Sequence, residues 1–474
     1  MDVLATARDL LASGPLCDAC LGRPFADRSF GLTNDERGKA LRVAVALADD
    51  ADYESPERDA CWVCEGLTGQ YDEYAELAAE SVAGTEFGTY QVGTRAPPLV
   101  EENDRLLRED AGLEPDAGEL FKSEFNREVG KRFGRLTGTE VDFDRPDVLA
   151  ILDLDAADAD PSTHAVDVQV NPAFVYGRYK KLERDVPQTE WPCRECGASG
   201  KQLGDDGEEP CEHCGGSGYL YDDSVEGYVA PHVREAMDGS EAVFHGAGRE
   251  DVDALMLGDG RPFVVEVKHP GVRDVDVDAL QAEINDGADG AVAVQDLALA
   301  THDMVERVKE LDASKTYRAE VEFGAPVSSE ALQAALDELE GATITQHTPQ
   351  RVDHRRASID RTRQVYAASG ELRAEQRSAN RSSSAERRSA DHSSGQRPRE
   401  DGEGDEPRDV EETHATVDVH GEGGLYIKEL VSGDDGRTEP SLAGLLGVDA
   451  TVTALDVLSV EGEDEAFAVD EYLQ

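Results

Sequence analysis

The stretch HGAGREDVDALMLGDGRPFVVEVK spans residues 245–268 and decides the fold of this chain. Its glycines permit tight backbone approach, and one arginine and three acids are packed into residues 249–253. Apolar runs at 254–257 and 263–268 predict strands on the far side of this polar turn. A polar turn that is presented by rigid elements is a common place for a functional site.

Helical and strand patterns alternate on both sides of this stretch. Apolar spacing predicts helices at 225–237, 277–285, 304–311 and 329–339, and strands at 242–245, 291–297, 316–323 and 343–346. A further short strand is expected at 351–358, and the pattern resumes at 413–474 with strands at 415–419 and 451–460. The C-terminal half is therefore a mixed α/β region, interrupted between 370 and 412.

The interruption, residues 370–412, is rich in Ser, Arg, Glu and Gly and almost free of large apolar side chains, which predicts a disordered insertion. Residues 351–399 carry twelve arginines against six acids, a net of +6. In a chain whose formal net charge is −56, that reversal could tether RNA, or it could belong to a tolerated surface loop.

The acidity of the whole chain indicates adaptation to high salt. Lys and Arg number 46 against 102 Asp and Glu, yet 39% of residues are hydrophobic and the acids are scattered. At molar ionic strength the Debye length is ~3 Å, so self-repulsion is screened and net acidity does not exclude an RNA partner. We expect a cytoplasmic protein, because neither a span of ~20 apolar residues nor a signal peptide is evident.

The eight cysteines form four CxxC pairs, which predict two structural zinc sites. Forty residues separate the first two pairs and 14 separate the last two. In a reducing compartment such pairs favour a tetrahedral metal over disulfides. The expected ligands are Cys17, Cys20, Cys61 and Cys64 in one site, and Cys193, Cys196, Cys211 and Cys214 in the other.

These sites divide the first 221 residues. We predict a zinc-binding region at 1–66, with helices at 4–11 and 33–47 and Asn34 as a possible cap. A mixed region follows at 67–186, with helices at 100–111 and 119–133 and strands at 148–154 and 165–170, and a ribbon-like unit at 187–221. Interleaved basic and aromatic residues at 174–184 make Arg178, Lys180 and Lys181 candidate RNA contacts, although a solvated strand edge has the same pattern.

The polar turn is compatible with three functions. Asp251 with Glu266 and Lys268 imitates the carboxylates and lysine of a magnesium-dependent nuclease, but short patterns of this kind are common in an acidic chain. An RNA-binding scaffold without catalysis is also possible. The third function is nucleobase isomerisation, which needs one ionised aspartate, an aromatic ring for the flipped base and a cation that keeps the carboxylate charged, with no cofactor or metal.

The order of the motifs resembles the archaeal tRNA pseudouridine synthases that modify the T-arm, the Pus-ten type with an N-terminal cysteine and THUMP-type region. Gly248-Arg-Glu-Asp251 matches the Gly-Arg-x-Asp turn of pseudouridine synthases. The likeness covers most of the chain and departs from the family in the 370–412 insertion and in the acidity. It is carried by both the first cysteine quartet and the segments GRYKK (177–181), QTEWPC (188–193), SVE (224–226), HGAGREDVDA (245–254), GRPF (260–263), KTY (315–317), TPQRVDHRR (348–356) and YIKE (426–429).

The resemblance implies an α+β protein whose 67–186 region is a THUMP-type RNA-binding domain. Residues 222–474 would then be a pseudouridine-synthase-type catalytic domain with a central mixed or antiparallel sheet. It also implies tRNA as partner, conversion of uridines 54 and 55 to pseudouridine, and neither a catalytic nor a nucleotide cofactor. The sequence leaves the oligomeric state open.

Site residues follow from the same resemblance, residue by residue. Asp251 would be the catalytic group, Tyr317 would stack on the target base and Lys428 would pair with the aspartate. Leu455 would form the apolar floor of the pocket, and Arg249 would contact the substrate. Arg351, Arg355 and Arg356 would bind RNA beside the basic residues of the 174–184 segment.

A chelator separates the two enzymatic functions. An isomerase should act on tRNA in EDTA during a short assay and leave the strand intact, because its chemistry needs no metal. A nuclease should stop in EDTA, and without it should cut the RNA. Gel analysis of tRNA incubated with the protein in molar KCl makes the comparison, and chelator-sensitive cleavage would exclude the isomerase.

Overall fold

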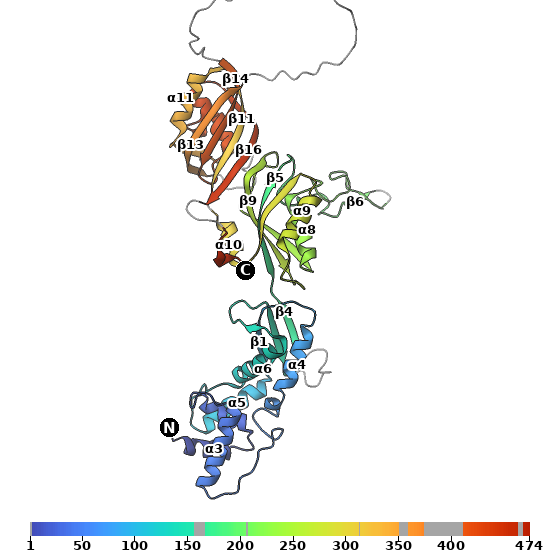
Figure 1. Ribbon diagram of the computed structural model, residues 1–474, viewed down its shortest axis with the longest axis vertical. Helices are drawn as coiled ribbons and strands as arrows, with labels where there is room; N and C mark the ends of the chain where they lie inside the picture. Colours follow the sequence, from blue (N-terminus) through green and yellow to red (C-terminus); the bar gives the residue numbers. More distant parts are fainter. Residues whose placement is uncertain are drawn as a thin grey trace, which may run out of the picture. The chain divides into compact units, whose positions relative to one another are not determined.

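The computed structural model describes residues 2–155, 166–204, 207–311, 313–349, 359–373, 411–462 and 468–474 (Figure 1). The chain forms two compact units. Unit 1 comprises Met1–Ala173, Arg234–Ala242 and Val267–Val275, and unit 2 comprises Phe174–Val233, Val243–Glu266 and Asp276–Gln474. None of the helices in these ranges is long and apolar enough to cross a membrane.

Unit 1 contains a small sheet in the order β2-β1-β3-β4, built from Glu140–Val141, Thr89–Arg95, Val148–Asp153 and Val166–Val170. β1 runs parallel to β2 and β3, and β4 is antiparallel to β3. Helices α4 (Tyr71–Ser81) and α6 (Phe121–Thr137) pack against this sheet, and α3 (Asn34–Ala48) lies farther from it (Figure 1). The other helices of the unit are α1 (Val3–Ala12), α2 (Asp18–Gly22) and α5 (Pro98–Asp110).

Local sequence signals explain the helices of unit 1. α3 begins with a capping box in which Thr33 and Glu36 bond to each other's backbone, so the cap is Thr33, one residue before the predicted Asn34. On α6 the residues Phe121, Phe125, Val129 and Phe133 are buried at helical spacing, as predicted.

One hydrophobic core in unit 1 contains buried residues from Ala7 to Leu154. It includes the cysteines at 17, 20, 61 and 64, the buried face of α6 and the inward residues of β1 and β3. This core contains residues from both of the predicted regions, 1–66 and 67–186. The first segment of unit 1 ends at Ala173, because the strand that follows belongs to the large sheet of unit 2.

That sheet is ten-stranded and mixed, as expected. Its order is β10-β5-β9-β16-β11-β14-β13-β12-β15, with β8 paired to β9. β9 and β16 are parallel, whereas β11 is antiparallel to both β16 and β14. The strands are β5 (Ala173–Lys181), β8 (Glu241–Gly246), β9 (Leu255–Lys268), β10 (Val292–Ala300), β11 (Ala313–Ser328), β12 (Thr343–His347), β13 (Asp360–Arg373), β14 (Glu411–Gly421), β15 (Thr438–Glu439) and β16 (Ala450–Gly462).

Helices and a hairpin complete unit 2. A separate two-stranded sheet, β6 (Lys201–Gly204) and β7 (Gly207–Pro210), lies within the ribbon-like segment. Gly258 marks a close approach of β9 to β16, since a Cβ there would lie 1.8 Å from the Leu458 carbonyl oxygen. The helices are α8 (Val225–Ala236), α9 (Val277–Gly287), α10 (Asp303–Glu310), α11 (Ser329–Leu339), α12 (Ile427–Ser432) and α13 (Leu442–Leu446).

β13 and β14 flank the segment 374–410, which contains most of the expected insertion. They pair antiparallel, and Arg373 at the end of β13 lies opposite His414 near the start of β14. The chain thus leaves and re-enters the sheet at neighbouring positions. The strand expected at 351–358 and nearly all of the insertion expected at 370–412 lie outside the described residues.

Candidate active site and metal centres

The polar turn is the loop between β8 and β9, residues 247–254, which we call the Asp251 loop. Gly248 has φ +75°, in the left-handed region that favours glycine. The Ala247 N–H donates to the Pro262 carbonyl (3.1 Å) and the Ala254 N–H donates to the Asp251 carbonyl (3.0 Å). Both ends of the loop are therefore tied down.

A buried carboxylate anchors the loop from inside. The Glu250 side chain is 1% exposed, and Arg261 Nε lies 2.9 Å from its Oε2. The Tyr179 hydroxyl lies 2.9 Å from both carboxylate oxygens, and Lys181 Nζ is 4.0 Å from Oε1. A buried carboxylate is tolerated only when it is paired in this way, so the position of Glu250 is strongly specified.

The same buried groups also hold the loop backbone. Lys181 donates to the carbonyls of Asp251 (3.1 Å) and Val252 (2.9 Å), Arg261 to Ala247 (2.7 Å), and Gln188 to Gly248 (2.8 Å). Burial lowers the pKa of Lys181, and the nearby carboxylates oppose that shift. Asp251 is thus carried on a backbone that side chains of β5 and β9 immobilise.

Unlike Glu250, Asp251 points to a partly open site. Its side chain is 37% exposed, and its Oδ2 lies 3.3 Å from Nζ of Lys428, which is 25% exposed. Lys428 lies in the first turn of α12 and also contacts Asp253 at 3.1 Å. Partial burial raises the pKa of Asp253, but the hydrogen bond and charge of Lys428 outweigh burial and the net shift is downward. One cation therefore serves two carboxylates.

Tyr317 and Leu455 lie on neighbouring strands, β11 and β16. Leu455 pairs with Ala319 and is buried in the core of the sheet, and Tyr317 packs against that core. Burial raises the pKa of Tyr317 to about 12; Arg261 opposes the shift, and the charges of Asp251 and Glu250 add to it. The phenol is therefore neutral and lies within the electrostatic reach of Asp251. Arg249 is exposed on the Asp251 loop.

The three predicted RNA contacts on β5 do not lie on the same face of the strand. Lys181 was predicted to contact RNA, but its side chain is fully buried and holds the Asp251 loop, so we correct that assignment. Arg178 is partly exposed and donates to the carbonyls of Asp259, Gly260 and Val460. Lys180 is partly exposed on the same face as Arg178, because side chains alternate along a strand. Arg351, Arg355 and Arg356 lie outside the described residues.

The buried supports of the loop were missed by sequence reasoning. Glu250 stands beside Asp251, and Arg261 opens an apolar strand. The available signal was a charged residue in an otherwise buried segment, which must find a partner. Sequence alone does not say which acid and which base meet.

The nuclease residues make other contacts. Glu266 pairs with His245 (2.9 Å) and Lys268 with Glu241 (2.8 Å). Across the described ranges, the groups of side chains that could hold a metal are the two cysteine quartets, and neither includes Asp251 or Glu266. The arrangement does not favour a magnesium site at the Asp251 loop.

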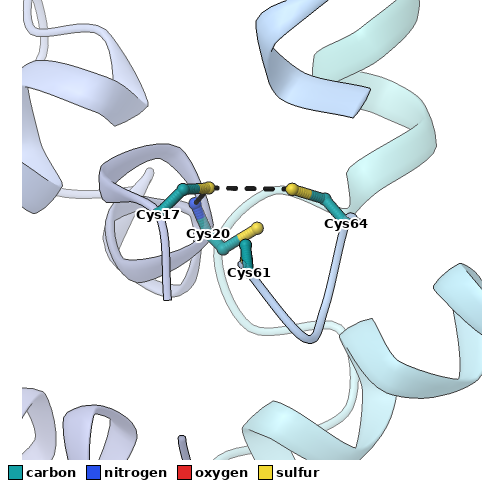
Figure 2. Close-up of side chains that lie close together, drawn as sticks. All are labelled: Cys17, Cys20, Cys61 and Cys64. Atoms are coloured by element: carbon teal, nitrogen blue, oxygen red, sulfur yellow. Dashed lines mark hydrogen bonds between the residues drawn. The ribbon is translucent and has the colours of Figure 1, made fainter. Parts of the chain in front are cut away.

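Both quartets have the geometry of a tetrahedral thiolate site. Their ligand atoms lie within 4.8 Å of one another. Zinc–sulfur bonds of ~2.3 Å require sulfurs ~3.8 Å apart. The distances are 3.7 Å for Cys17–Cys64 (Figure 2), 4.0 Å for Cys193–Cys211 and 3.8 Å for Cys196–Cys214. Each quartet therefore fits one zinc ion in a structural site.

Comparisons with known proteins agree along the whole chain. The profile described as "Pus10, C-terminal" matches residues 174–381 and 403–461, and "Pus10 THUMP domain, archaeal" matches 74–153. Proteins named "tRNA pseudouridine synthase Pus10" are similar at 62% identity in Halorubrum lacusprofundi (100% of both chains), and at 39% in Methanothrix thermoacetophila (98% of this chain, 96% of the relative). The one from Pyrococcus furiosus is 33% identical (97% and 98%).

A solved complex shows only a distant likeness. In the Cbf5–Nop10–Gar1 complex, 61% of this chain aligns with 60% of the solved chain at 15% identity and a TM-score of 0.26, a level that supports no structural argument.

Metal content provides a direct test of the quartets. We expect about two zinc ions per chain, because each quartet supplies four sulfurs at zinc spacing. Cys17→Ser and Cys193→Ser should each lower the content to about one ion, since each removes a ligand from a different site. Elemental analysis of the purified chain measures this, and a wild-type value below one would mean that the cysteines are free thiols.

Proposed function

The chain belongs to the Pus10 family of tRNA pseudouridine synthases, and on that premise we propose that it converts uridines 54 and 55 of the tRNA T-loop to pseudouridine through Asp251. The observation that carries this proposal is the contrast between two adjacent acids. Glu250 is buried and paired, whereas Asp251 is partly open and within 3.3 Å of Lys428. Of these two adjacent acids, Asp251 is the one whose carboxylate can reach a substrate.

The reaction is an isomerisation and needs no external reagent. The uridine is flipped out of the loop, and Asp251 either adds to it covalently or assists departure of the base. The N1–C1′ bond breaks, the freed base turns, and C5 bonds to C1′. C5 then loses its proton and N1 gains one, so the atoms balance.

Neighbouring residues meet the remaining requirements. The Lys428 ammonium lies 3.3 Å from Oδ2 of Asp251, so it places a positive charge beside the carboxylate. Tyr317 offers a neutral aromatic face for the flipped base, since the pKa of its phenol is raised to about 12. Leu455 closes the apolar floor beneath, and exposed Arg249 is available to a phosphate.

The tRNA contacts remain proposals. Lys180 and Arg178 lie on one partly exposed face of β5, and we propose that this face contacts the tRNA backbone together with Arg351, Arg355 and Arg356. The zinc ions would be held by the two quartets and would supply structural cross-links rather than take part in the reaction.

Asp251 can be tested against an acid of the same loop. Asp251→Asn should lower pseudouridine formation by roughly 10²–10⁴-fold or more while tRNA binding persists, because the reacting carboxylate is lost and the shape is kept. Carbodiimide-based mapping of a tRNA transcript in molar KCl locates the product. Transcripts with cytidine at 54 or at 55 show whether each position is modified independently.

Asp253→Asn is the matched control. It makes the same chemical change two residues away and also touches Lys428. It should keep most of the turnover, because Asp251 remains in place. Undiminished turnover in Asp251→Asn, or equal losses in both variants, would remove Asp251 from its proposed role. If the wild-type protein binds tRNA but forms no pseudouridine, the result would favour an RNA-binding scaffold without catalysis.

Lys428 can be tested by charge. A hydrogen bond to a charged group contributes about 1.5–3 kcal/mol, so Lys428→Met should lower kcat roughly 10- to 100-fold. Lys428→Arg retains the positive charge and should recover most of that loss. Single-turnover rates make the measurement, and equal rates for the Met and Arg variants would show that charge at this position is not needed.

A further inference from the structure

A cavity lies in unit 2 at the base of the ribbon-like segment, and the proposed reaction does not use it. It has a volume of about 270 Å³ and is lined by Glu190, Trp191, Tyr219, Tyr221, Asp222, Asp223, Ser224, Gly227 and Tyr228. A water molecule in the liquid occupies ~30 Å³, so the space suits a small organic group. We call it the aromatic cavity.

Its walls are aromatic rings from α8 and from the two stems of the ribbon-like segment, which are the stretches of chain just before Cys193 and just after Gly218. The rings of Trp191 and Tyr221 meet edge to face, with centroids 5.5 Å apart and an interplanar angle of 86°. Tyr219 comes from the returning stem and Tyr228 from the first turn of α8. Several aromatic rings around a small space form the kind of cage that binds alkylated ammonium groups by cation–π attraction.

The ribbon sets the spacing of these rings. Pro192 and Tyr219 form an antiparallel bridge, the Leu220 N–H donates to the Trp191 carbonyl (2.9 Å), and the Cys193 N–H donates to the Gly218 carbonyl (2.8 Å). The second cysteine quartet begins directly beyond this bridge. The stems, and with them the walls, are therefore held at a fixed distance.

The charge at the cavity has one sign. Glu190, Asp222 and Asp223 line it, and its lining contains no lysine or arginine. The negative charges act on the tyrosines of the wall. The charge of Glu190 raises the pKa of Tyr219, and burial together with the charge of Asp223 raises the pKa of Tyr228. Such a site attracts a cation.

We propose that the aromatic cavity binds an alkylated organic cation, held by the ring faces and neutralised by the carboxylates at its edge. An alkylated cation is weakly hydrated, so it gives up less water on entering than an alkali ion does. The same chemistry occurs in a free quaternary ammonium compound and in a positively charged N-methylated purine of RNA. The inference does not depend on the isomerase activity.

A tryptophan inside the cavity supplies the reporter. The chain has two tryptophans, Trp62 and Trp191. Trp62→Phe leaves Trp191 as the single tryptophan, which excitation at the red edge of the absorption band selects over the tyrosines. The change is mild because the Trp62 indole nitrogen is buried and donates no hydrogen bond within the described residues. The full-length zinc-loaded Trp62→Phe protein is titrated in molar KCl with choline and with N7-methylguanosine. The uncharged carbon isostere of choline and unmethylated guanosine serve as neutral controls.

The expected result is saturable quenching of Trp191 by at least one of the two cations. Each should bind roughly 3- to 30-fold more tightly than its neutral counterpart if it is a ligand. Tighter binding of choline assigns a free ammonium compound, and tighter binding of N7-methylguanosine assigns a methylated base. No saturable binding of either cation, or equal binding of the neutral partners, would overturn the proposal.

Variants separate the cavity from general acidity. Asp223→Asn and Tyr228→Leu should each weaken cation binding several-fold, because they remove a carboxylate or a ring from the wall. Asp278→Asn makes the same charge change at an exposed residue of α9 that does not line the cavity, and should leave binding unchanged. Far-ultraviolet circular dichroism confirms folding, and equal weakening by Asp278→Asn and Asp223→Asn would show that only net charge matters.

Discussion

The buried carboxylate of Glu250 is the constraint on which the catalytic part of the structure depends. A charge without solvent must be compensated by partners at defined distances. Arg261 and Tyr179 contact it directly, and Lys181 stands 4.0 Å away. Since these partners come from β5 and β9, satisfying one acid fixes two strands and the loop between β8 and β9 together.

This constraint separates the roles of two neighbouring acids. In sequence, Glu250 and Asp251 are adjacent carboxylates on one glycine-rich turn, and only the family motif distinguishes Asp251. In the fold, one is 1% exposed and the other 37%. The backbone that buries Glu250 directs Asp251 toward Lys428, so the buried side chain stabilises the geometry and the open one remains available for the reaction.

Unit 1 uses the same principle in another form. Arg23 is fully buried and joins Asp104 (2.7 Å) and Glu124 (3.1 Å), which lie on α5 and α6. Four cysteines meet beside it within one continuous hydrophobic core. Because charge compensation and metal ligation each demand specific partners, segments more than a hundred residues apart are held in a single compact body.

Sequence by itself determined what depends on local spacing and on ordered motifs. The apolar period identified α6, the paired CxxC motifs identified both quartets, and the order of motifs identified the family, Asp251 and Lys428 as candidates. It misplaced the cap of α3 by one residue, because Asn and Thr are similar caps. The sequence could not show that β5 pairs in the ten-stranded sheet, because a linear pattern does not specify which sheet a strand joins.

Tertiary structure alone decided which charges are buried and which rings face one another. Lys181 has the local pattern of an RNA contact, yet it holds the Asp251 loop from inside. Trp191, Tyr221 and Tyr228 form no periodic pattern. The bridge at the base of the ribbon-like segment brings Trp191 close to Tyr221, and α8 carries Tyr228 to the same cavity. Burial and long-range pairing depend on how distant segments pack, and a linear pattern carries no record of those distances.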